Sequence, residues 1–232
     1  MRFIDFIRDA FALLFPELCA SCKQALVYQE KQICTECIYH LPKTDFHLDP
    51  DNLAARQLMG RVPIVAASSF LYYSYGSSVQ EIIHHLKYKQ GFATAQVMGE
   101  LYGLELKESA AFCDFDFIVP VPLHKKRLRS RGYNQSAYFA QGLSKSLKIP
   151  SHPGNLIRKT YNESQVQSGS RYERYENTRN IFDIKNPQLL QGKHILLVDD
   201  VLTTGATLEA CSETLLTIPD VKVSVATIAF AK

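Results

Sequence analysis

The sequence predicts an α/β domain with a mostly parallel sheet and helices on both faces, preceded by a small N-terminal helix and a four-cysteine zinc ribbon. Two observations lead to this prediction. Short apolar strand-like runs alternate with helical segments through most of the chain, which is typical of a parallel sheet covered on both faces. Two Cys-x-x-Cys pairs stand close together near the N-terminus, as in small metal-stabilised units.

Length and composition predict one core domain with an appendage. The chain has 232 residues, 46% hydrophobic and 21% charged, as in ordinary globular proteins. We expect the helix and ribbon at residues 1–42 and the main α/β domain at residues 63–232. The polar, proline-containing segment 43–62 is expected to link them.

The first 15 residues are apolar enough to suggest a signal peptide, but Asp5, Arg8 and Asp9 interrupt the run. One helical face gathers the large apolar side chains Phe3, Phe6, Ile7, Phe11 and Leu14. We therefore expect an amphipathic helix that packs on its own protein. Membrane association is the alternative, although the polar face lacks a basic excess. The expected location is the cytoplasm, without stable membrane insertion.

Four of the six cysteines form two knuckles separated by eleven residues: Cys19, Cys22, Cys34 and Cys37. Such a set can surround one tetrahedral zinc ion and leaves no open position for catalysis, so we expect a structural zinc. Disulfides are the alternative, and a reducing compartment disfavours them. His40 lies close enough to replace a ligand. Cys113 and Cys211 are expected to be buried apolar residues.

The main-domain elements follow from apolar runs and helical periodicity. Strands are expected at residues 64–73, 115–121, 194–198 and 221–230, and helices at residues 78–88, 91–106, 133–147 and 206–216. In the first of these helices Val79, Ile82, Ile83 and Leu86 share one face. The polar face of that helix carries His84, His85, Lys87 and Lys89, of which two could reach a ligand pocket.

The segment ILLVDDVLTTGAT at residues 195–207 carries the most specific signal. Asp199 and Asp200 follow an apolar strand, at the end where parallel sheets bind ligands. A loop of small residues then enters a helix: Thr203, Thr204, Gly205, Ala206 and Thr207. Its backbone N–H groups, hydroxyls and helix dipole favour a phosphate. The carboxylates would repel that phosphate, so we expect them to accept hydrogen bonds from sugar hydroxyls.

Rival readings of this segment fail on the sequence. Neither the phosphate loop G-x-x-x-x-G-K-[ST] nor the dinucleotide motif G-x-G-x-x-G occurs anywhere in the chain. Receiver domains also contain an apolar strand followed by two acids, but they need far more chain after the acids than the 32 residues that remain. A ribose 5-phosphate satisfies both halves of the segment.

The string V-D-D-V-x-T-T-G-A-T at residues 198–207 resembles the motif with which type I phosphoribosyltransferases bind 5-phosphoribosyl-1-pyrophosphate (PRPP). That resemblance implies a phosphoribosyltransferase-like domain of the type I fold at residues 63–232. It also implies that Asp199 and Asp200 hold the ribose hydroxyls and that residues 203–207 hold the 5-phosphate. The order of further motifs resembles the ComF/ComFC (GntX-like) family: the two knuckles, LKYK-x-G at 86–91, VPVPL at 119–123, RGYNQ at 131–135 and SR-x-x-R-x-x-N at 170–177. Members are described as predicted amidophosphoribosyltransferases and linked to DNA uptake in natural transformation.

Positive charge is concentrated beside these motifs. Residues 123–179 hold twelve Lys/Arg and three Glu, a net charge of +9, which indicates an anion site. By the resemblance, Lys125 and Arg127 would hold the pyrophosphate of PRPP together with Mg²⁺, and Arg131 would act in catalysis with the acid pair. A solvated basic loop is the alternative. Segment 158–182 would form a hood over PRPP, with Arg171, Arg174 and Asn177 on one helical face.

Two functions remain open at this level. The first is Mg²⁺-dependent transfer of ribose 5-phosphate from PRPP to a nitrogen nucleophile, by positioning and by stabilising the departing pyrophosphate. The chain lacks an N-terminal cysteine nucleophile, so glutamine hydrolysis is not expected. The alternative is a non-catalytic PRPP sensor or adaptor, which would bind single-stranded DNA or a DNA-uptake helicase through basic and tyrosine side chains.

Overall fold

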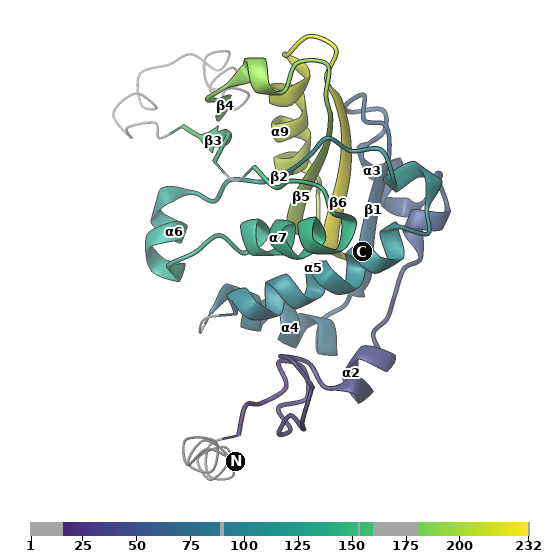
Figure 1. The fold of residues 1–232 in the computed structure, drawn as a ribbon, viewed down its shortest axis with the longest axis vertical. Helices are drawn as coiled ribbons and strands as arrows, with labels where there is room; N and C mark the ends of the chain where they lie inside the picture. Colours follow the sequence, from purple (N-terminus) through teal and green to yellow (C-terminus); the bar gives the residue numbers. More distant parts are fainter. Residues whose placement is uncertain (1–15, 89–90, 153, 160–180, 232) are drawn as a thin grey trace.

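The computed structural model describes residues 16–88, 91–152, 154–159 and 181–231. Its centre is a four-stranded parallel sheet with the order β1-β6-β5-β2 (Figure 1). The strands are β1 (Ala67–Tyr73), β2 (Phe117–Pro120), β5 (His194–Leu202) and β6 (Lys222–Ala231). The predicted parallel sheet is therefore confirmed, and all four predicted strand regions contribute to it.

Helices cover both faces of the sheet. One face carries α4 (Ser78–Lys87), α5 (Phe92–Leu106) and α7 (Gln135–Leu147), and the other carries α3 (Leu53–Leu58) and α9 (Ala206–Leu216). Successive residues of β5 enter alternate cores, because side chains of a strand point to opposite faces. Leu196 and Val198 pack in the first core, and Ile195 and Leu197 in the second. A strand buried on both faces needs apolar residues throughout, as HILLV has.

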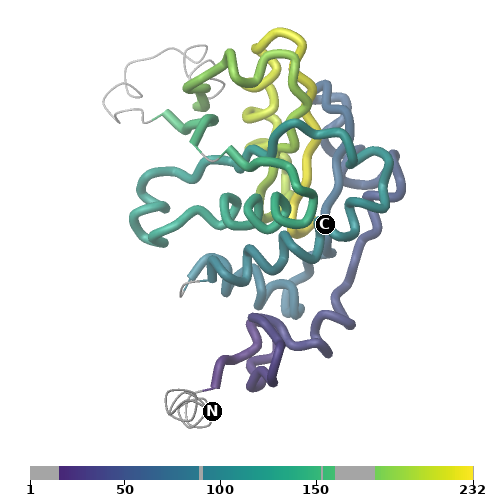
Figure 2. The backbone as a smooth tube through the Cα atoms, viewed as in Figure 1, coloured from purple at the N-terminus to yellow at the C-terminus, as the bar shows by residue number. Residues whose placement is uncertain are grey.

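Short elements complete the described chain. They are α2 (Thr35–Tyr39), η1 (Phe46–Leu48), η2 (Ala110–Phe112), α6 (Lys125–Arg131), η4 (Pro187–Leu189), and an antiparallel pair of β3 (Leu156–Arg158) with β4 (Phe182–Ile184). The four-cysteine ribbon lies at one end of the molecule beside α4, and the chain then runs up to the sheet (Figure 2).

The four predicted helices are confirmed, and α9 begins and ends at the predicted residues. Two segments differ from expectation. The strand predicted to end at Val198 continues to Leu202, because it pairs with β6 along its whole length. The basic segment after β2 forms the helix α6 rather than a loop, with the His124 side chain accepting a hydrogen bond from the Lys126 N–H at its start.

The segment predicted as a linker contains η1 and α3, and it buries Phe46, Ala54 and Leu58 against the sheet. The domain boundaries themselves remain a prediction. Cys211 is buried as predicted, but the prediction for Cys113 is wrong. Phe112 occupies the core position at the end of η2, so its neighbour Cys113 turns outward and donates to the Ala110 carbonyl.

Within the described residues, every helix is too short or too polar to cross a bilayer. The predicted N-terminal helix lies outside this part of the chain. The same holds for residues 160–180 of the predicted hood, which contain Arg171, Arg174 and Asn177.

Candidate functional site

The four-cysteine ribbon brings its predicted ligands together. The sulfur atoms of Cys19, Cys22, Cys34 and Cys37 lie within 4.8 Å of one another. The sulfur atoms of Cys22 and Cys34 are 3.8 Å apart. Two sulfur ligands of a tetrahedral zinc ion, with bonds of about 2.3 Å, are separated by the same distance. The set therefore fits a zinc ion. His40 is not part of the cluster, and its Nδ1 lies 3.0 Å from the Glu36 carbonyl oxygen.

Backbone N–H groups point at these sulfurs, as they do around a bound thiolate. The Cys34 N–H lies 3.3 Å from Cys19 Sγ, and the Cys37 N–H lies 3.4 Å from Cys34 Sγ. Burial raises the pKa of Cys19, but the N–H groups of Cys34, Cys22 and Ser21 outweigh burial and lower that pKa to about 7. The pKa shifts differ within the cluster: burial raises the pKa of Cys37 to about 12, and the pKa of Cys34 is also raised. A bound metal would itself favour the deprotonated sulfurs that it requires.

The ribbon is joined to the main domain by shared packing. Cys19, Ile33 and Cys34 belong to the same hydrophobic core as α4 and α5. Polar contacts cross the same boundary. Thr94 Oγ1 donates to Gln32 Oε1 at 3.0 Å, and Lys23 pairs with Glu81 at 3.5 Å.

The acid pair lies near the C-terminal end of β5, beside the N-terminus of α7. Ser136 Oγ donates to Asp199 Oδ1 at 2.8 Å, and Gln135 Nε2 donates to Asp200 Oδ2 at 2.9 Å. Asn134 fixes this helix start, because its side chain accepts from the Ser136 N–H and donates to the Val121 carbonyl at the end of β2. The two carboxylates are therefore held by the first turn of one helix. From α4, Lys87 Nζ reaches Asp200 Oδ2 at 3.5 Å.

The electrostatics of this pair favour a cationic or hydroxyl-bearing ligand. Burial raises the pKa of Asp199, and the adjacent Asp200 carboxylate raises it further, to about 7, against the lowering effects of Ser136 and Lys87. Gln135 is 3% exposed, and its Oε1 has no hydrogen-bond partner among the described residues. A buried oxygen without a donor beside two carboxylates fits a ligand that brings hydroxyl groups or a metal ion.

The loop after β5 has the conformation of an anion site. Gly205 has φ +80° and precedes the first turn of α9, whose N–H groups are not capped by any side chain of the described residues. From α3 and the turn after it, Gln57 donates to the Thr203 carbonyl, and Arg61 Nη1 donates to the Thr204 carbonyl at 2.6 Å. These contacts fix the orientation of two peptide groups of the loop.

A small cavity of about 120 Å³ joins these parts. The acid pair, four basic side chains, the first residues of α7 and α9 and the segment after β2 line this cavity. The residues are Asp199, Asp200, Lys87, Arg127, Arg131, Arg158, Gln135, Ser136, Thr207 and residues 121–123. A second hollow of about 40 Å³ is lined by residues 203–208 and shares Asp199 and Thr207 with the first. We call the two together the acid-pair site.

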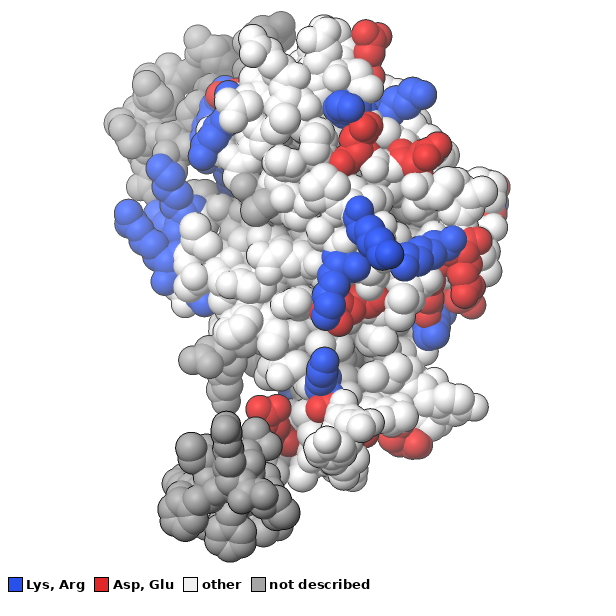
Figure 3. Space-filling view, in the orientation of Figure 1, with Lys and Arg blue, Asp and Glu red and all other residues white. Residues whose placement is uncertain are grey.

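Most of the predicted site residues meet here. Arg127 and Arg131 of α6 line the same cavity as the carboxylates, whereas Lys125 does not. Lys and Arg side chains gather over α6 at the left edge of the surface in Figure 3. The contributions of Gln135, Ser136 and Arg158 were not predicted. Gln135 and Ser136 follow the capping residue Asn134, which is the one signal in the sequence that could have located them.

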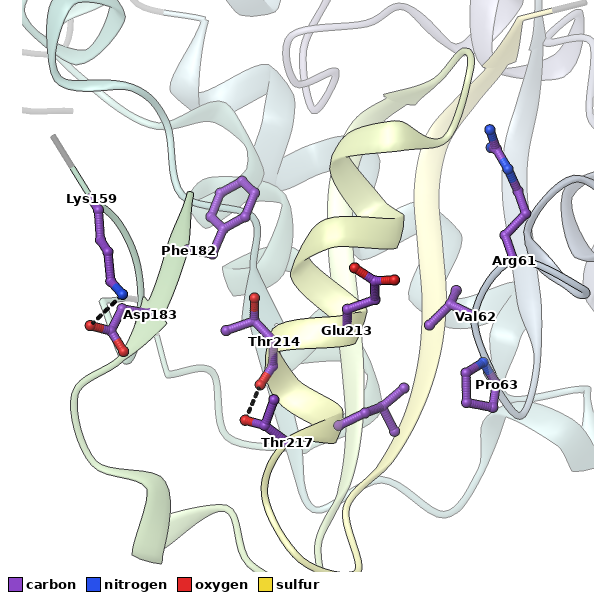
Figure 4. Close-up of a pocket in the computed structure, with 10 residues that line it drawn as sticks. Arg61, Val62, Pro63, Lys159, Phe182, Asp183, Glu213, Thr214 and Thr217 are labelled. Carbon is purple, nitrogen blue, oxygen red and sulfur yellow. Dashed lines mark hydrogen bonds and ion pairs between the residues drawn. The ribbon is translucent and has the colours of Figure 1, made fainter. Parts of the chain in front are cut away.

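A wider hollow of about 550 Å³ lies beside the C-terminal half of α9. It lies between residues 61–63, the strand β4 and the helix residues Glu213, Thr214 and Thr217 (Figure 4). None of the predicted ligand-binding residues lines it. Arg61 lines this hollow and also donates to the Thr204 carbonyl in the loop after β5.

Comparison with known proteins gives the class first. The sequence model of the family described as "Phosphoribosyl transferase domain" matches residues 134–232, from the start of α7 through β5 and α9 to the chain's last strand. The main domain is therefore of the phosphoribosyltransferase type, as predicted.

Curated relatives then give the particular family. Competence protein ComFC of Bacillus subtilis (strain 168) is 30% identical over 211 residues, covering 89% of this chain and 82% of that protein. DNA utilization protein YhgH of Escherichia coli (strain K12) is 29% identical over 202 residues, covering 86% and 84%. Competence protein F of Haemophilus influenzae is 29% identical over 138 residues, covering 58% and 60%. The chain belongs to the ComF/ComFC family.

Proposed function

We propose that this protein binds PRPP with Mg²⁺ at the acid-pair site and transfers the ribose 5-phosphate of PRPP to a nitrogen nucleophile. We further propose that this activity has a role in DNA uptake. The observation that carries the proposal is the cavity in which two carboxylates, a helix N-terminus and side chains of four basic residues face one another. A ligand that fits all three must carry hydroxyl groups and more than one phosphate group. PRPP has this combination.

Each half of the ligand matches one half of the site. We assign the ribose hydroxyls to Asp199 and Asp200, whose carboxylate oxygens accept hydrogen bonds. The 5-phosphate is assigned to the loop of residues 203–207, with Gly205 giving the backbone the conformation that the turn needs.

The pyrophosphate is assigned to Arg127 and Arg131, which line the cavity from α6. Lys125, also proposed for this role from the sequence, begins the same helix and would act from outside the cavity. Mg²⁺, when bound, supplies positive charge to the pyrophosphate, and the oxygens available to it from the protein are those of Asp199, Asp200 and Gln135. Zinc in the four-cysteine ribbon has a structural role in this proposal, because four thiolates close its coordination.

Catalysis would rest on position and charge. The bond from the anomeric carbon to the pyrophosphate oxygen breaks as the bond to the acceptor nitrogen forms, and negative charge grows on the leaving group. Arg131 and Arg127 stabilise that charge inside a small, partly desolvated cavity, where electrostatic effects are larger than in water.

The biological role is inferred from relatives. Proteins named for competence and for DNA utilization match most of this chain, and we extend that role to it, with the cytoplasm as the place of action. The alternative is a PRPP-sensing or single-stranded-DNA-binding adaptor with a DNA-uptake helicase as partner. One observation favours it: Tyr28 and Tyr39 of the ribbon region are 92% and 82% exposed and could stack on bases.

Calorimetric titration of the zinc-loaded protein with PRPP and Mg²⁺ tests the proposal. The paired substitution Asp199→Asn and Asp200→Asn keeps the size of both side chains and should abolish binding, because the amides lose the charge. Asp220→Asn is the matched control, since Asp220 is exposed and lies outside the site, and it should bind as the parent does.

Equal affinity in the parent and the paired variant would refute the assignment of the ligand to this site. Turnover is tested separately by pyrophosphate release with ammonia and simple amines as acceptors. Binding of PRPP without release of pyrophosphate would favour the PRPP-sensing alternative. A single-stranded-DNA affinity that is lost in Tyr28→Ala/Tyr39→Ala would support the adaptor.

A further inference from the structure

Three metal-binding side chains meet away from the acid-pair site. Asp45 and His47 come from η1 and the residue before it, and Glu105 comes from the last turn of α5. One ligand atom of each lies within 4.8 Å of the other two. None of the three lines the acid-pair site, and none belongs to the four-cysteine cluster.

His47 is the most informative of the three. It is 5% exposed, and its ring lies beside the carboxylates of Asp45 and Glu105. Its backbone is held in place, because Ser109 Oγ donates to the His47 carbonyl at 2.5 Å. Its ring stands edge-on to Tyr102, with the ring centroids 6.4 Å apart. A buried imidazole held in place beside two carboxylates can donate a ring nitrogen to a metal ion.

The two carboxylates also call for a cation. Asp45 is exposed, Glu105 is half-buried, and two like charges this close repel one another unless positive charge lies near them. Lys43 supplies part of it, since its Nζ lies 2.6 Å from Glu105 Oε1. A carboxylate has two oxygens, so this ion pair leaves Glu105 able to bind a second cation.

We propose that Asp45, His47 and Glu105 form a second metal site, for a divalent first-row transition-metal ion such as Mn²⁺ or Zn²⁺. Imidazole nitrogen together with carboxylate oxygen is a donor set for these ions, whereas Mg²⁺ and Ca²⁺ favour oxygen alone. Ligands about 2.1 Å from an ion stand about 3.4 Å apart in a tetrahedron, so closing the site takes a small inward movement. The exposed Asp45 can make it.

The site would fasten the chain between ribbon and sheet. η1 is the first element after the ribbon, and its Phe46 is buried against Tyr72 and Phe230 at the ends of β1 and β6. An ion shared with Glu105 would tie η1 to the end of α5. Lys43 would weaken binding of that ion, because it places a positive charge beside one of the ligands.

Manganese is the probe, because its free ion is counted by electron paramagnetic resonance. The full chain is first loaded with zinc to fill the four-cysteine site and then titrated with Mn²⁺. We expect Asp45→Asn to weaken one Mn²⁺ site at least tenfold. Asparagine tolerates the left-handed backbone of Asp45, which has φ +54°, so this variant should fold as the parent does. His47→Gln should lose the same site.

Two control variants show where the Mn²⁺ binds. Glu108→Gln removes an exposed carboxylate beside the end of α5 but outside the cluster, and it should bind Mn²⁺ as the parent does. Asp199→Asn/Asp200→Asn should leave this Mn²⁺ site in place. Lys43→Met should strengthen it several-fold. Unchanged Mn²⁺ binding in Asp45→Asn and His47→Gln, or loss only in the Asp199/Asp200 variant, would overturn the proposal.

Discussion

The four-cysteine ribbon and the acid-pair site are built in opposite ways. All four ribbon ligands come from 19 consecutive residues, and two knuckles of fixed spacing bring them together. The acid-pair site draws on α4, α6, α7, β3, β5 and α9, so residues as distant as Lys87 and Thr207 line one cavity.

The ribbon therefore depends on a short stretch of chain, whereas the acid-pair site depends on the whole folded domain. The ribbon needs metal to hold its short chain together, since a unit of this size has little core of its own. The acid-pair site needs the sheet, because only strand order places the end of β2 beside the end of β5. Damage to one should therefore leave the other largely intact.

The largest expected effect is the loss of the ribbon ligand Cys34. Cys34→Ser should reduce the zinc content by one ion per chain, as measured by atomic emission. If the lost metal costs about 3 kcal/mol of unfolding free energy, Tm should fall by about 10 °C. Cys113→Ser is the matched control, because Cys113 is exposed and lies outside the cluster.

The same variant tests the independence of the two regions. We expect the PRPP affinity of folded Cys34→Ser to stay within about threefold of the parent value. Cys34 does pack in the core that also contains α4, the helix that ends at Lys87. A large loss of PRPP affinity would mean that the ribbon positions α4 and that the site is not assembled by the sheet alone.

A second comparison lies within the basic helix α6. Arg131 lines the cavity and Lys125 does not, although the sequence places both in one basic run. Arg131→Ala should weaken PRPP binding about tenfold, because a charge-assisted contact inside a partly buried site contributes about 1.5–3 kcal/mol. Lys125→Ala should change the affinity less than about threefold. Equal losses, measured by calorimetry, would favour a diffuse positive field over direct contact.

The sequence predicts what depends on neighbours along the chain. The spacing of the cysteines located the ribbon cluster, and the apolar run before Asp199 located both β5 and the edge of the sheet where the site lies. The start of α9 could be predicted because a loop of small residues, Thr203 to Gly205, comes directly before it.

Side-chain partners across the fold could not be predicted in this way. Gln135 and Ser136 face the carboxylates because α7 packs against β2 and β5. The capping residue Asn134 marks the start of the helix, but it does not say which strands the helix packs against. Arg158 reaches the cavity from the short strand β3, which the sequence did not indicate. The burial of Phe46 in a segment rich in polar residues likewise follows from tertiary packing.

A third test compares two glycines with the same left-handed backbone conformation. Gly205 has φ +80° and Gly192 has φ +68°, so alanine at either position should cost about 1 kcal/mol of stability. A Cβ at Gly205 would also lie 2.9 Å from Leu58 Cδ2, whereas none of the described atoms lies within 4 Å at Gly192. Gly205→Ala should therefore weaken PRPP binding as well, by about tenfold, and Gly192→Ala should not. Equal PRPP affinities in the two variants would show that the loop of residues 203–207 does not contact PRPP.

The smallest expected effect is a dependence of stability on pH. The pKa of Asp199 is about 7 in the folded protein and near 3.9 when unfolded, so the folded state binds the extra proton between these values. The contribution of Asp199 to stability is full below about pH 4 and is lost as the pH rises through 7. Asp199→Asn removes this loss. In the absence of ligand its Tm should exceed that of the parent by a few degrees at pH 8, and the difference should vanish near pH 4. A constant difference across that range would mean that the Asp199 carboxyl is ionised throughout, and that the acid pair is not held in the desolvated state that burial beside Asp200 implies.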